Sequence, residues 1–541
     1  MLGARHRDKW VKMTQLTTSL PVEADLVVVG AGAAGCVLAA RLSEDRTRSV
    51  ILLEAGTTTG EEPESRTPGN AFQLLAGPHA WSDVTTPQAA LGGRRIGLPQ
   101  GRGLGGGSSM NMMAWFHGRP EDYDTWQARG AAGWGWPEVR STLRLIEDSD
   151  RGADDWHGAG GPMAITSIRD AGPLPLTFVA AGVEHGLPLV EDFNGPIGEG
   201  VGLIQSNIRD GRRHSVVDGY LAPARGRDNL TVATGHQVTG VLWDGVRAVG
   251  VRVGDTEIRA RSGVVLCAGA LRSPQLLLLS GVGPADHLHD LGIPVVRDLP
   301  GVGANLQDHP MVTPVWPVID GSPLWNSLTA DDVRDYRLLR RGPLASLTQA
   351  AATLRSEAAR PVADLQFTLT LLGMTAEMTL IEEPVVTCAI SVLDPDSHGT
   401  VRLAGVDPTL APLVDPGYLQ DAGDRARLRS GLRRARELFR TPTLAKATGG
   451  EALAPEDWSD EGLDTWIDGN VGSEWHPVGT CRMGTDTAAV IDPATMAVHG
   501  TDGLFVADAS VMPTITRGNT QAPTIMIAER AAERIARARL R

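Results

Sequence analysis

Cysteine is scarce in this chain of 541 residues, and the cysteines are scattered along it. Cys36, Cys267, Cys388 and Cys481 form no CxxC pair, so the sequence predicts neither a zinc site nor a disulfide framework. We therefore expect no bound metal and a reducing compartment.

Long apolar runs are also lacking. No stretch has the length needed to span a membrane, and the N-terminus lacks the continuous apolar segment of a signal peptide. We therefore expect a cytoplasmic protein without a membrane span. Residues 1–22 are predicted to form a flexible tail, within which Met13 is an alternative start.

Positive charge is in deficit, with 50 Lys and Arg against 64 Asp and Glu, a net charge of −14. Such a surface repels phosphate backbones, which argues against a nucleic-acid partner.

The length predicts two or three packed units. The 64 glycines indicate many tight turns or a close approach of backbone to a ligand.

A dinucleotide-binding fingerprint stands near the N-terminus. A buried strand is predicted at 25–29, then GAGAAG at 30–35, then a helix, and then a second strand at 49–53 that ends at Glu54. The helix N-terminus offers its N–H groups to a pyrophosphate, and the carboxylate accepts hydrogen bonds from ribose hydroxyls. This βαβ unit predicts a bound dinucleotide without choosing between NAD and FAD.

Each glycine of the fingerprint has its own task. Gly30 allows the tight turn, Gly32 lets the pyrophosphate approach the backbone, and Gly35 lets the helix pack on the strand. Ala33 and Ala34 lie between Gly32 and Gly35 and are expected to contact the cofactor as well. An ordinary strand–turn–helix with incidental glycines is the alternative, which the acidic residue at the end of the second strand disfavours.

Later elements predict a mixed fold. The fold class is α/β, with a Rossmann-like cofactor domain assembled from discontinuous segments and an α+β substrate domain that contains an antiparallel sheet. Strands are expected at 231–234 and 240–243, both antiparallel, and at 264–267, 364–372, 384–393 and 504–507; helices are expected at 273–281, opened by Ser273 and Pro274, and at 428–439 and 522–540. The cofactor domain is expected at 23–155, 226–310 and 476–541, and the substrate domain at 156–225 and 311–475.

Several ordered segments go beyond generic patterns. Four segments resemble signatures of one enzyme family: GRGLGGGSSMN at 101–111, GALRSPQLLLLSGVG at 269–283, PGVGANLQDHP at 300–310, and HPVGTCRMG at 476–484 with the following ADASVMPTITRGNTQAP. The family that they resemble is the glucose–methanol–choline oxidoreductase family. The resemblance covers the chain from residue 25 to the C-terminal helix, except for 311–470. It implies FAD as the cofactor and oxidation of an alcohol as the reaction.

The resemblance also assigns cofactor contacts. The glycine–serine loop at 103–109 can wrap phosphates and flavin, Asp508 and Ala509 lie against the ribityl–pyrophosphate part, and Val238 packs its backbone on adenine. Asp508 alternatively caps a helix, and Val238 alternatively is a core residue. The further contacts implied are Arg102, Gly106, Ser108, Met110, Asn111, Met112, Ala268, Gly269, Thr520 and Gln521. Because Met110 stands where some members carry a flavin-linking histidine, we expect FAD to be bound non-covalently.

The catalytic pair implied by the resemblance is His476 and Asn519. His476 would accept the hydroxyl proton and Asn519 would orient the same oxygen. A structural histidine and a turn asparagine are the alternatives. Trp475 is expected to line the substrate pocket, and Glu474 either shares a face with His476, if the chain there is extended, or turns to solvent.

The same scaffold supports other reactions. The expected partners are a small alcohol and an electron acceptor, which is oxygen, a quinone or a carrier. A flavin-containing lyase that cleaves cyanohydrins, a light-driven decarboxylase and a non-enzymatic flavoprotein are the alternatives. The presence of both His476 and Asn519 disfavours the last.

Overall fold

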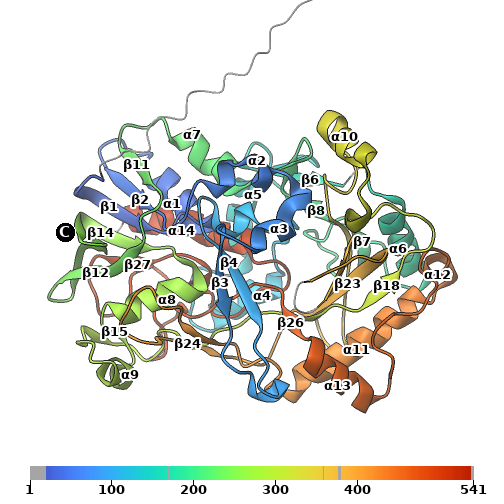
Figure 1. The fold of residues 1–541 in the computed structure, drawn as a ribbon. Helices are drawn as coiled ribbons and strands as arrows, with labels where there is room; N and C mark the ends of the chain where they lie inside the picture. Colours follow the sequence, from blue (N-terminus) through green and yellow to red (C-terminus); the bar gives the residue numbers. More distant parts are fainter. Residues whose placement is uncertain (1–19, 169, 358, 376–378, 538–541) are drawn as a thin grey trace, which may run out of the picture.

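The computed structural model describes residues 20–168, 170–357, 359–375 and 379–537 (Figure 1). The predicted tail at 1–22 and the alternative start at Met13 therefore lie almost wholly outside the described residues. Two large sheets dominate the structure, one on each side in Figure 1, and a cavity described below is lined by residues of both. Within the described ranges no helix is long and apolar enough to cross a membrane.

The predicted βαβ unit is confirmed. Strand β1 (Glu23–Val29) leads into helix α1 (Ala33–Leu42), and strand β2 (Val50–Leu53) pairs with β1 in parallel. Both strands are buried, as expected of central parallel strands. A Cβ on Gly35 would lie 1.8 Å from the carbonyl oxygen of Gly30, so glycine alone allows this close helix–strand packing.

The first sheet has the order β11-β2-β1-β14-β13-β12, with β27 beside β14. Its further members are β11 (Leu230–Ala233), β12 (Val238–Asp244), β13 (Arg247–Val253), β14 (Thr256–Leu266) and β27 (Leu504–Val506). The expected strands at 264–267 and 504–507 thus lie side by side and parallel. The antiparallel expectation is confirmed for 240–243, in the β12–β13 hairpin.

The expectation that residues 231–234 form an antiparallel strand is wrong. Strand β11 pairs in parallel with β2, with Leu230 opposite Val50. The chain reaches it through the crossover segment that ends in the short helix α7 (Ala222–Ala224), and such a connection returns a strand in parallel. A four-residue apolar run carries no sequence signal for its direction.

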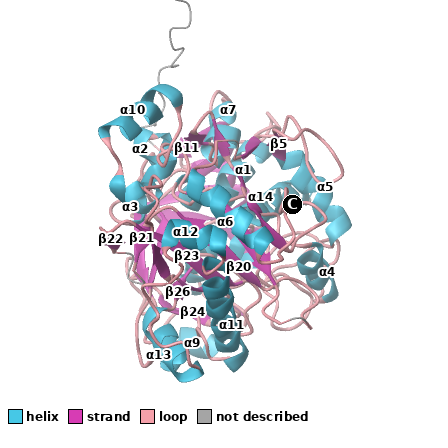
Figure 2. Cartoon of the chain, turned by 90° about the vertical axis from the view of Figure 1, so that its right-hand side faces the viewer, coloured by secondary structure: helices cyan, strands magenta, loops and turns pink. Residues whose placement is uncertain are grey.

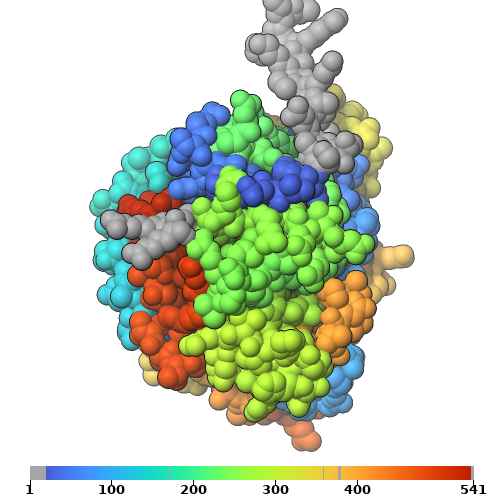
Figure 3. All heavy atoms as spheres, turned by 90° about the vertical axis from the view of Figure 1, so that its left-hand side faces the viewer, coloured from blue at the N-terminus to red at the C-terminus, as the bar shows by residue number. Residues whose placement is uncertain are grey.

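The discontinuous assembly of this half is confirmed. Figure 3 shows the blue N-terminal segment, the green middle segment and the red C-terminal segment on one continuous face. Helix α14 (Gln521–Arg537) packs on α1, where Glu529 accepts hydrogen bonds from Arg41 at 2.8–3.1 Å and from the Tyr220 hydroxyl at 2.7 Å. A partly buried ion pair therefore joins α1 to α14 across 488 positions of the sequence.

The second sheet is antiparallel, as predicted. Its order is β26-β17-β23-β20-β19-β7, with β18 beside β23. Its strands are β7 (Gly200–Leu203), β17 (Pro310–Val312), β18 (Val315–Pro317), β19 (Thr348–Leu354), β20 (Leu365–Thr370), β23 (Val385–Val392) and β26 (Gly472–Ser473). The domain boundaries drawn from the sequence stay a prediction.

Helices cover one face of the second sheet. They are α6 (Pro173–Glu184), α11 (Ala422–Phe439) and α12 (Pro442–Thr448), seen in front of the sheet in Figure 2. Leu365, Phe367 and Leu369 of β20 belong to the hydrophobic core on this side. Because side chains alternate along a strand, the residues between them face the other way, toward the first half of the molecule.

Helix α8 (Gly269–Leu279) begins four residues before the expected start at Ser273 and Pro274. Pro274 lies inside the helix and cannot donate a backbone hydrogen bond to the carbonyl of Ala270. The hydroxyl of Thr480 donates to that carbonyl instead, at 2.6 Å. This tertiary partner offsets the defect and allows the helix to extend past the proline.

A buried charge network holds the segment that follows the glycine–serine loop. Glu147 accepts hydrogen bonds from His117 at 2.7 Å, His157 at 2.8 Å and Trp115 at 2.7 Å, and His157 also bonds Asp192 at 2.7 Å. Burial alone would lower the pKa of His157, but its hydrogen bonds to Asp192 and Glu147 raise it to about 10. His157 is therefore an imidazolium at neutral pH.

We expect His157→Gln to lower the free energy of unfolding by about 3–5 kcal/mol, because it leaves buried carboxylates without their cation. The pKa of His157 is raised from 6.5 to about 10, so its stabilisation is complete below pH 6.5 and is lost as the pH rises toward 10. Urea denaturation between pH 6.5 and 9.5 checks both points. An equal loss of stability with pH in wild type and variant would contradict this assignment.

Candidate active site

One cavity runs between the loops of the first sheet and the strands of the second. Gly30, Glu54 and Ala268 line it on one side, and Met311 and Thr368 on the other. Nearly all predicted site residues line this cavity. Gly35 does not, since it packs α1 on β1, and Arg102 does not, since its guanidinium lies over the Trp81 ring at 4.6 Å.

The fingerprint forms one end of the cavity. Gly32 caps α1 without any side-chain hydrogen bond, and Ala33 and Ala34 of its first turn line the cavity. The N–H groups of this turn therefore point at open space, as an anion site requires. The carboxylate of Glu54 accepts the N–H groups of Ala31 and Gly56, both at 2.8 Å, and burial raises its pKa.

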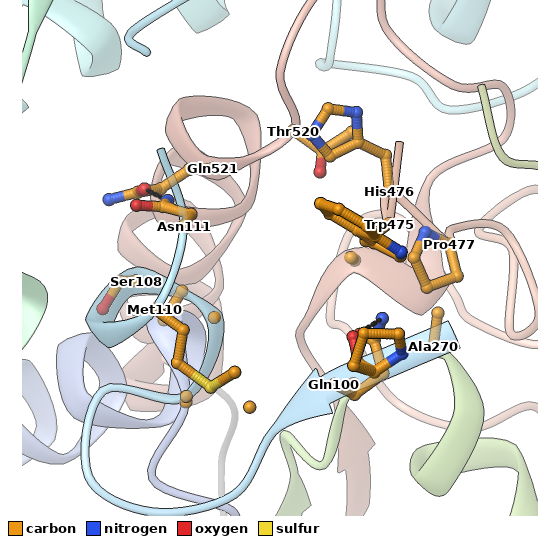
Figure 4. Close-up of a pocket in the computed structure, with 18 of the residues that line it drawn as sticks. Gln100, Ser108, Met110, Asn111, Ala270, Trp475, His476, Pro477, Thr520 and Gln521 are labelled. Atoms are coloured by element: carbon orange, nitrogen blue, oxygen red, sulfur yellow. Dashed lines mark hydrogen bonds between the residues drawn. The ribbon is translucent and has the colours of Figure 1, made fainter. Parts of the chain in front are cut away.

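The glycine–serine loop closes over this end. A Cβ on Gly106, whose φ is 50°, would lie 2.8 Å from the Cα of Gly32, so the two glycine turns touch. Ser108 donates to the carbonyl of Gly105 at 2.7 Å. Met110 is buried and faces the cavity opposite Trp475 and His476 (Figure 4).

Polar side chains fix the end of this loop. Asn111 donates to the Gln521 side chain, and Arg213 donates to Asn111 Oδ1 at 2.7 Å. Figure 4 shows Asn111 and Gln521 side by side, with Thr520 across the cavity near His476. Met112 also lines the cavity. The loop is thus held in place by the start of α14.

The C-terminal strand contributes Asp508 and Ala509. Asp508 accepts the N–H of Gly269 at 2.8 Å, the hydroxyl of Ser273 at 2.6 Å and the N–H of Ser510 at 2.8 Å. Its carboxylate therefore caps α8 and also faces the cavity. Val238, Ala268 and Ala509 line the same side.

His476 and Asn519 meet at the other end. Asn519 Nδ2 lies 3.2 Å from His476 Nε2, and His476 Nδ1 lies 3.0 Å from His309 Nδ1. If the Asn519 amide donates to His476 Nε2, that nitrogen carries no proton. The proton of the neutral ring is then on Nδ1, and His476 Nδ1–H donates to His309. Burial lowers the pKa of His476 to about 3, so the ring is neutral at physiological pH.

Glu474 also lies close to this pair, but the backbone conformation that places it there differs from the predicted one. The segment is not extended, because Trp475 adopts a left-handed conformation with φ of 60°. Ser473 Oγ accepts the Trp475 N–H at 2.7 Å, and the Glu474 N–H donates to the carbonyl of His309 at 3.1 Å. Glu474 Oε2 then lies 3.7 Å from both histidine Nδ1 atoms instead of facing solvent.

The environment of Glu474 is unusual for a carboxylate. Its Oε2 is buried without a hydrogen-bond partner, and burial raises its pKa to about 7. The donor atoms of Glu474, His309 and His476 lie within 4.8 Å of one another, a spacing that could also hold a metal ion. The hydrogen bond between His309 and His476 is sufficient to explain why these two rings are in contact.

Sequence reasoning gave no role to Asp308 or His309, although both lie in the segment at 300–310. Asp308 Oδ1 accepts the N–H of His476 at 2.8 Å and of His309 at 2.9 Å, and Oδ2 accepts the hydroxyls of Tyr418 at 2.5 Å and of Ser473. Burial raises the pKa of Asp308. The only sequence feature that could have pointed to these two residues was the motif DHP at 308–310.

Family models match most of the chain. Models described as GMC oxidoreductase match residues 24–311 and 395–528. The chain belongs to the GMC oxidoreductase family. It is thus an oxidoreductase, and the resemblance seen in the sequence motifs is confirmed.

Full-length relatives agree with this placement. An alcohol dehydrogenase [acceptor] of Pseudomonas putida is 37% identical over 95% of this chain and 96% of its own length. An oxygen-dependent choline dehydrogenase of Rhizobium johnstonii is 36% identical over the same shares. The crystal structure of pyridoxine 4-oxidase from Mesorbium loti superposes with a TM-score of 0.86, at 33% identity over 94% of this chain and 98% of that one.

Proposed function

We propose that this GMC oxidoreductase oxidises an alcohol to an aldehyde or ketone with FAD, using His476 as the base. The observation that carries the proposal is the cavity itself. A dinucleotide-type cradle stands at one end, and a neutral imidazole with an adjacent amide stands at the other. Similarity to alcohol and choline dehydrogenases supports the reaction class.

The residues present fit FAD. A Cβ on Gly32, Gly107 or Gly269 would meet nothing within 4 Å, so bare backbone faces the cavity at each of these positions. Gln521 Nε2 is buried without a partner at the cavity wall and can donate to a ligand. The N-terminus of α1 would hold the pyrophosphate and Glu54 the ribose. FAD supplies a hydride acceptor when bound.

The chain's own residues handle the proton. The alcohol hydroxyl would take the place of the Asn519 amide as the donor to His476 Nε2, and the alcohol oxygen would accept from Asn519 Nδ2 instead. The imidazolium formed on His476 would be shared through Nδ1 with His309. Glu474, at 3.7 Å from both rings, stabilises that positive charge when ionised.

Two other reactions are open to this scaffold, a cyanohydrin-cleaving lyase and a light-driven decarboxylase. Anaerobic mixing with an alcohol, a cyanohydrin or a carboxylate in turn separates them from the proposal. We expect the flavin absorbance to bleach in the dark and an aldehyde or ketone to form in equal amount. Cyanide release without bleaching identifies a lyase, and loss of a carboxylate only under light identifies the decarboxylase.

We expect His476→Ala to keep its FAD but to reduce it roughly 10²–10⁴-fold more slowly, the usual contribution of a general base. Asn519→Ala is expected to be milder, because it removes an orienting hydrogen bond and leaves the proton acceptor. Anaerobic stopped-flow absorbance measures both rates. Near-normal reduction in the histidine variant would overturn the assignment.

FAD is expected to be bound non-covalently, because Met110 occupies the position of the linking histidine found in some members. Acid precipitation should leave yellow FAD in the supernatant. The control is a GMC enzyme with a covalent flavin, precipitated in parallel. Flavin that stays in the pellet of this protein contradicts the prediction.

Glu474 is expected to slow reoxidation by oxygen. Reduction of oxygen builds negative charge, and an ionised carboxylate nearby opposes it. Since its pKa is raised to about 7, the carboxylate is ionised above that pH and neutral below it. The physiological acceptor is then a quinone or carrier more readily than oxygen.

Stopped-flow mixing of substrate-reduced enzyme with air-saturated buffer tests this expectation. Glu474→Val should reoxidise faster than wild type above pH 7, and the difference should disappear at pH 5.5. Glu474→Gln keeps the size of the side chain and removes its charge. If wild type reoxidises as fast as both variants at pH 8, the carboxylate has no such effect.

A further inference from the structure

The inner face of the second sheet forms a polar wall of the cavity. Gln366, Thr368 and Thr370 of β20 line the cavity, while the residues between them pack against α11. Thr370 lies opposite Thr348 on one neighbouring strand and Thr387 on the other. A row of hydroxyls therefore crosses three adjacent strands at the cavity surface.

Part of this wall is unsatisfied. Thr348 is 2% and Gln366 1% exposed, and both Thr348 Oγ1 and Gln366 Oε1 are buried without a hydrogen-bond partner. Gln366 Nε2 donates to Thr368 Oγ1 at 3.1 Å, which leaves the Gln366 carbonyl oxygen as the unpartnered atom of this amide. Buried polar groups without partners are rare, and here a ligand that donates hydrogen bonds would satisfy them.

The unsatisfied atoms of the wall continue to the base. Glu474 Oε2 and Asn519 Oδ1 are also buried, unpartnered and part of the cavity lining. All four atoms can accept a hydrogen bond, and the Thr348 hydroxyl and the buried Gln521 Nε2 can also donate one. A ligand with several hydroxyls spread along its length, each able to donate and to accept, therefore matches this lining.

A cationic ligand matches this wall poorly. The other carboxylates of the lining each have a partner: Glu54 with backbone N–H groups, Asp83 through Oδ1 with Arg272 at 2.8 Å while its Oδ2 is unpartnered, and Asp508 with α8. The Trp81 ring is covered by the guanidiniums of Arg102 and Arg272 at 4.6 and 4.7 Å. Hydroxyl and amide groups are neutral partners, which suit the hydroxyls of a neutral ligand.

We infer that the substrate is a polyhydroxylated alcohol: one hydroxyl meets His476 and Asn519, and further hydroxyls donate to Gln366 and Thr348 on the wall of the second sheet. This inference rests on the proposed function and specifies its substrate class.

The first test compares four-carbon alcohols with the FAD-loaded enzyme under anaerobic conditions. Butan-1-ol, butane-1,4-diol and erythritol add hydroxyls on one chain length, and choline adds a positive charge. We expect kcat/KM for flavin reduction to rise about 3- to 12-fold for each added hydroxyl that is bonded, the usual range for such a bond. A preference for butan-1-ol or choline overturns the inference but leaves the proposed function intact, and bleaching by none of them counts against both.

The second test removes the acceptors on the wall. Gln366→Met and Thr348→Val keep the approximate side-chain size and should lower the ratio of kcat/KM for erythritol over butan-1-ol about 3- to 12-fold each, with the loss for erythritol in KM. Measuring a ratio within each variant cancels any loss of folded enzyme. Thr231→Val, on β11 away from the cavity, is the control and should leave the ratio unchanged. An unchanged ratio in both wall variants overturns the inference.

Discussion

The carboxylate of Asp308 is the constraint on which the end of the cavity at His476 depends. It lies in a fully buried position, where an isolated charge is strongly unfavourable, and four donors compensate it. Two of these are the backbone N–H groups of His309 and His476, which come from segments more than 160 positions apart. One oxygen atom therefore sets the separation of the two imidazoles and with it their Nδ1–Nδ1 hydrogen bond.

Glu474 gives this site a character that His476 alone would not have. In the proposed reaction, a carboxylate at 3.7 Å from both rings would favour the imidazolium of His476. If oxygen were the acceptor, the same carboxylate would oppose the new negative charge. The two halves of the proposed cycle would thus place opposite demands on one side chain, and the raised pKa of Glu474 would make their balance depend on pH near neutrality.

Local patterns in the sequence predicted much of the first half. The glycine fingerprint, the buried strands at 25–29 and 49–53 and the C-terminal helix follow from residue spacing. The cavity-lining residues around Ser108, His476 and Asn519 were expected from the family resemblance of their motifs. The start of α8 and the direction of β11 were predicted wrongly, because a remote hydroxyl from Thr480 and the pairing with β2 decide them.

Other features of the site depend on contacts that no local pattern encodes. The proximity of Glu474 to His476 requires a left-handed Trp475, a conformation that non-glycine residues seldom adopt and that the surrounding hydrogen bonds impose. The hydroxyl row of Thr348, Thr370 and Thr387 exists only through cross-strand register. Threonine in a strand is common, so its use at a cavity wall cannot be distinguished before the strands are paired.

A ligand bound in the cavity also affects the stability of the folded chain. Its walls come from the glycine turns at Gly32 and Gly106 on one side and from β20 and β23 on the other, so a ligand between them completes packing that the chain leaves open. A ligand that binds only the folded chain stabilises it by about 4 kcal/mol when its free concentration is 1,000 times its dissociation constant. The melting temperature of this protein is therefore a property of the chain and its cofactor supply together, and a shortage of flavin in the cell would reduce the amount of folded protein as well as its activity.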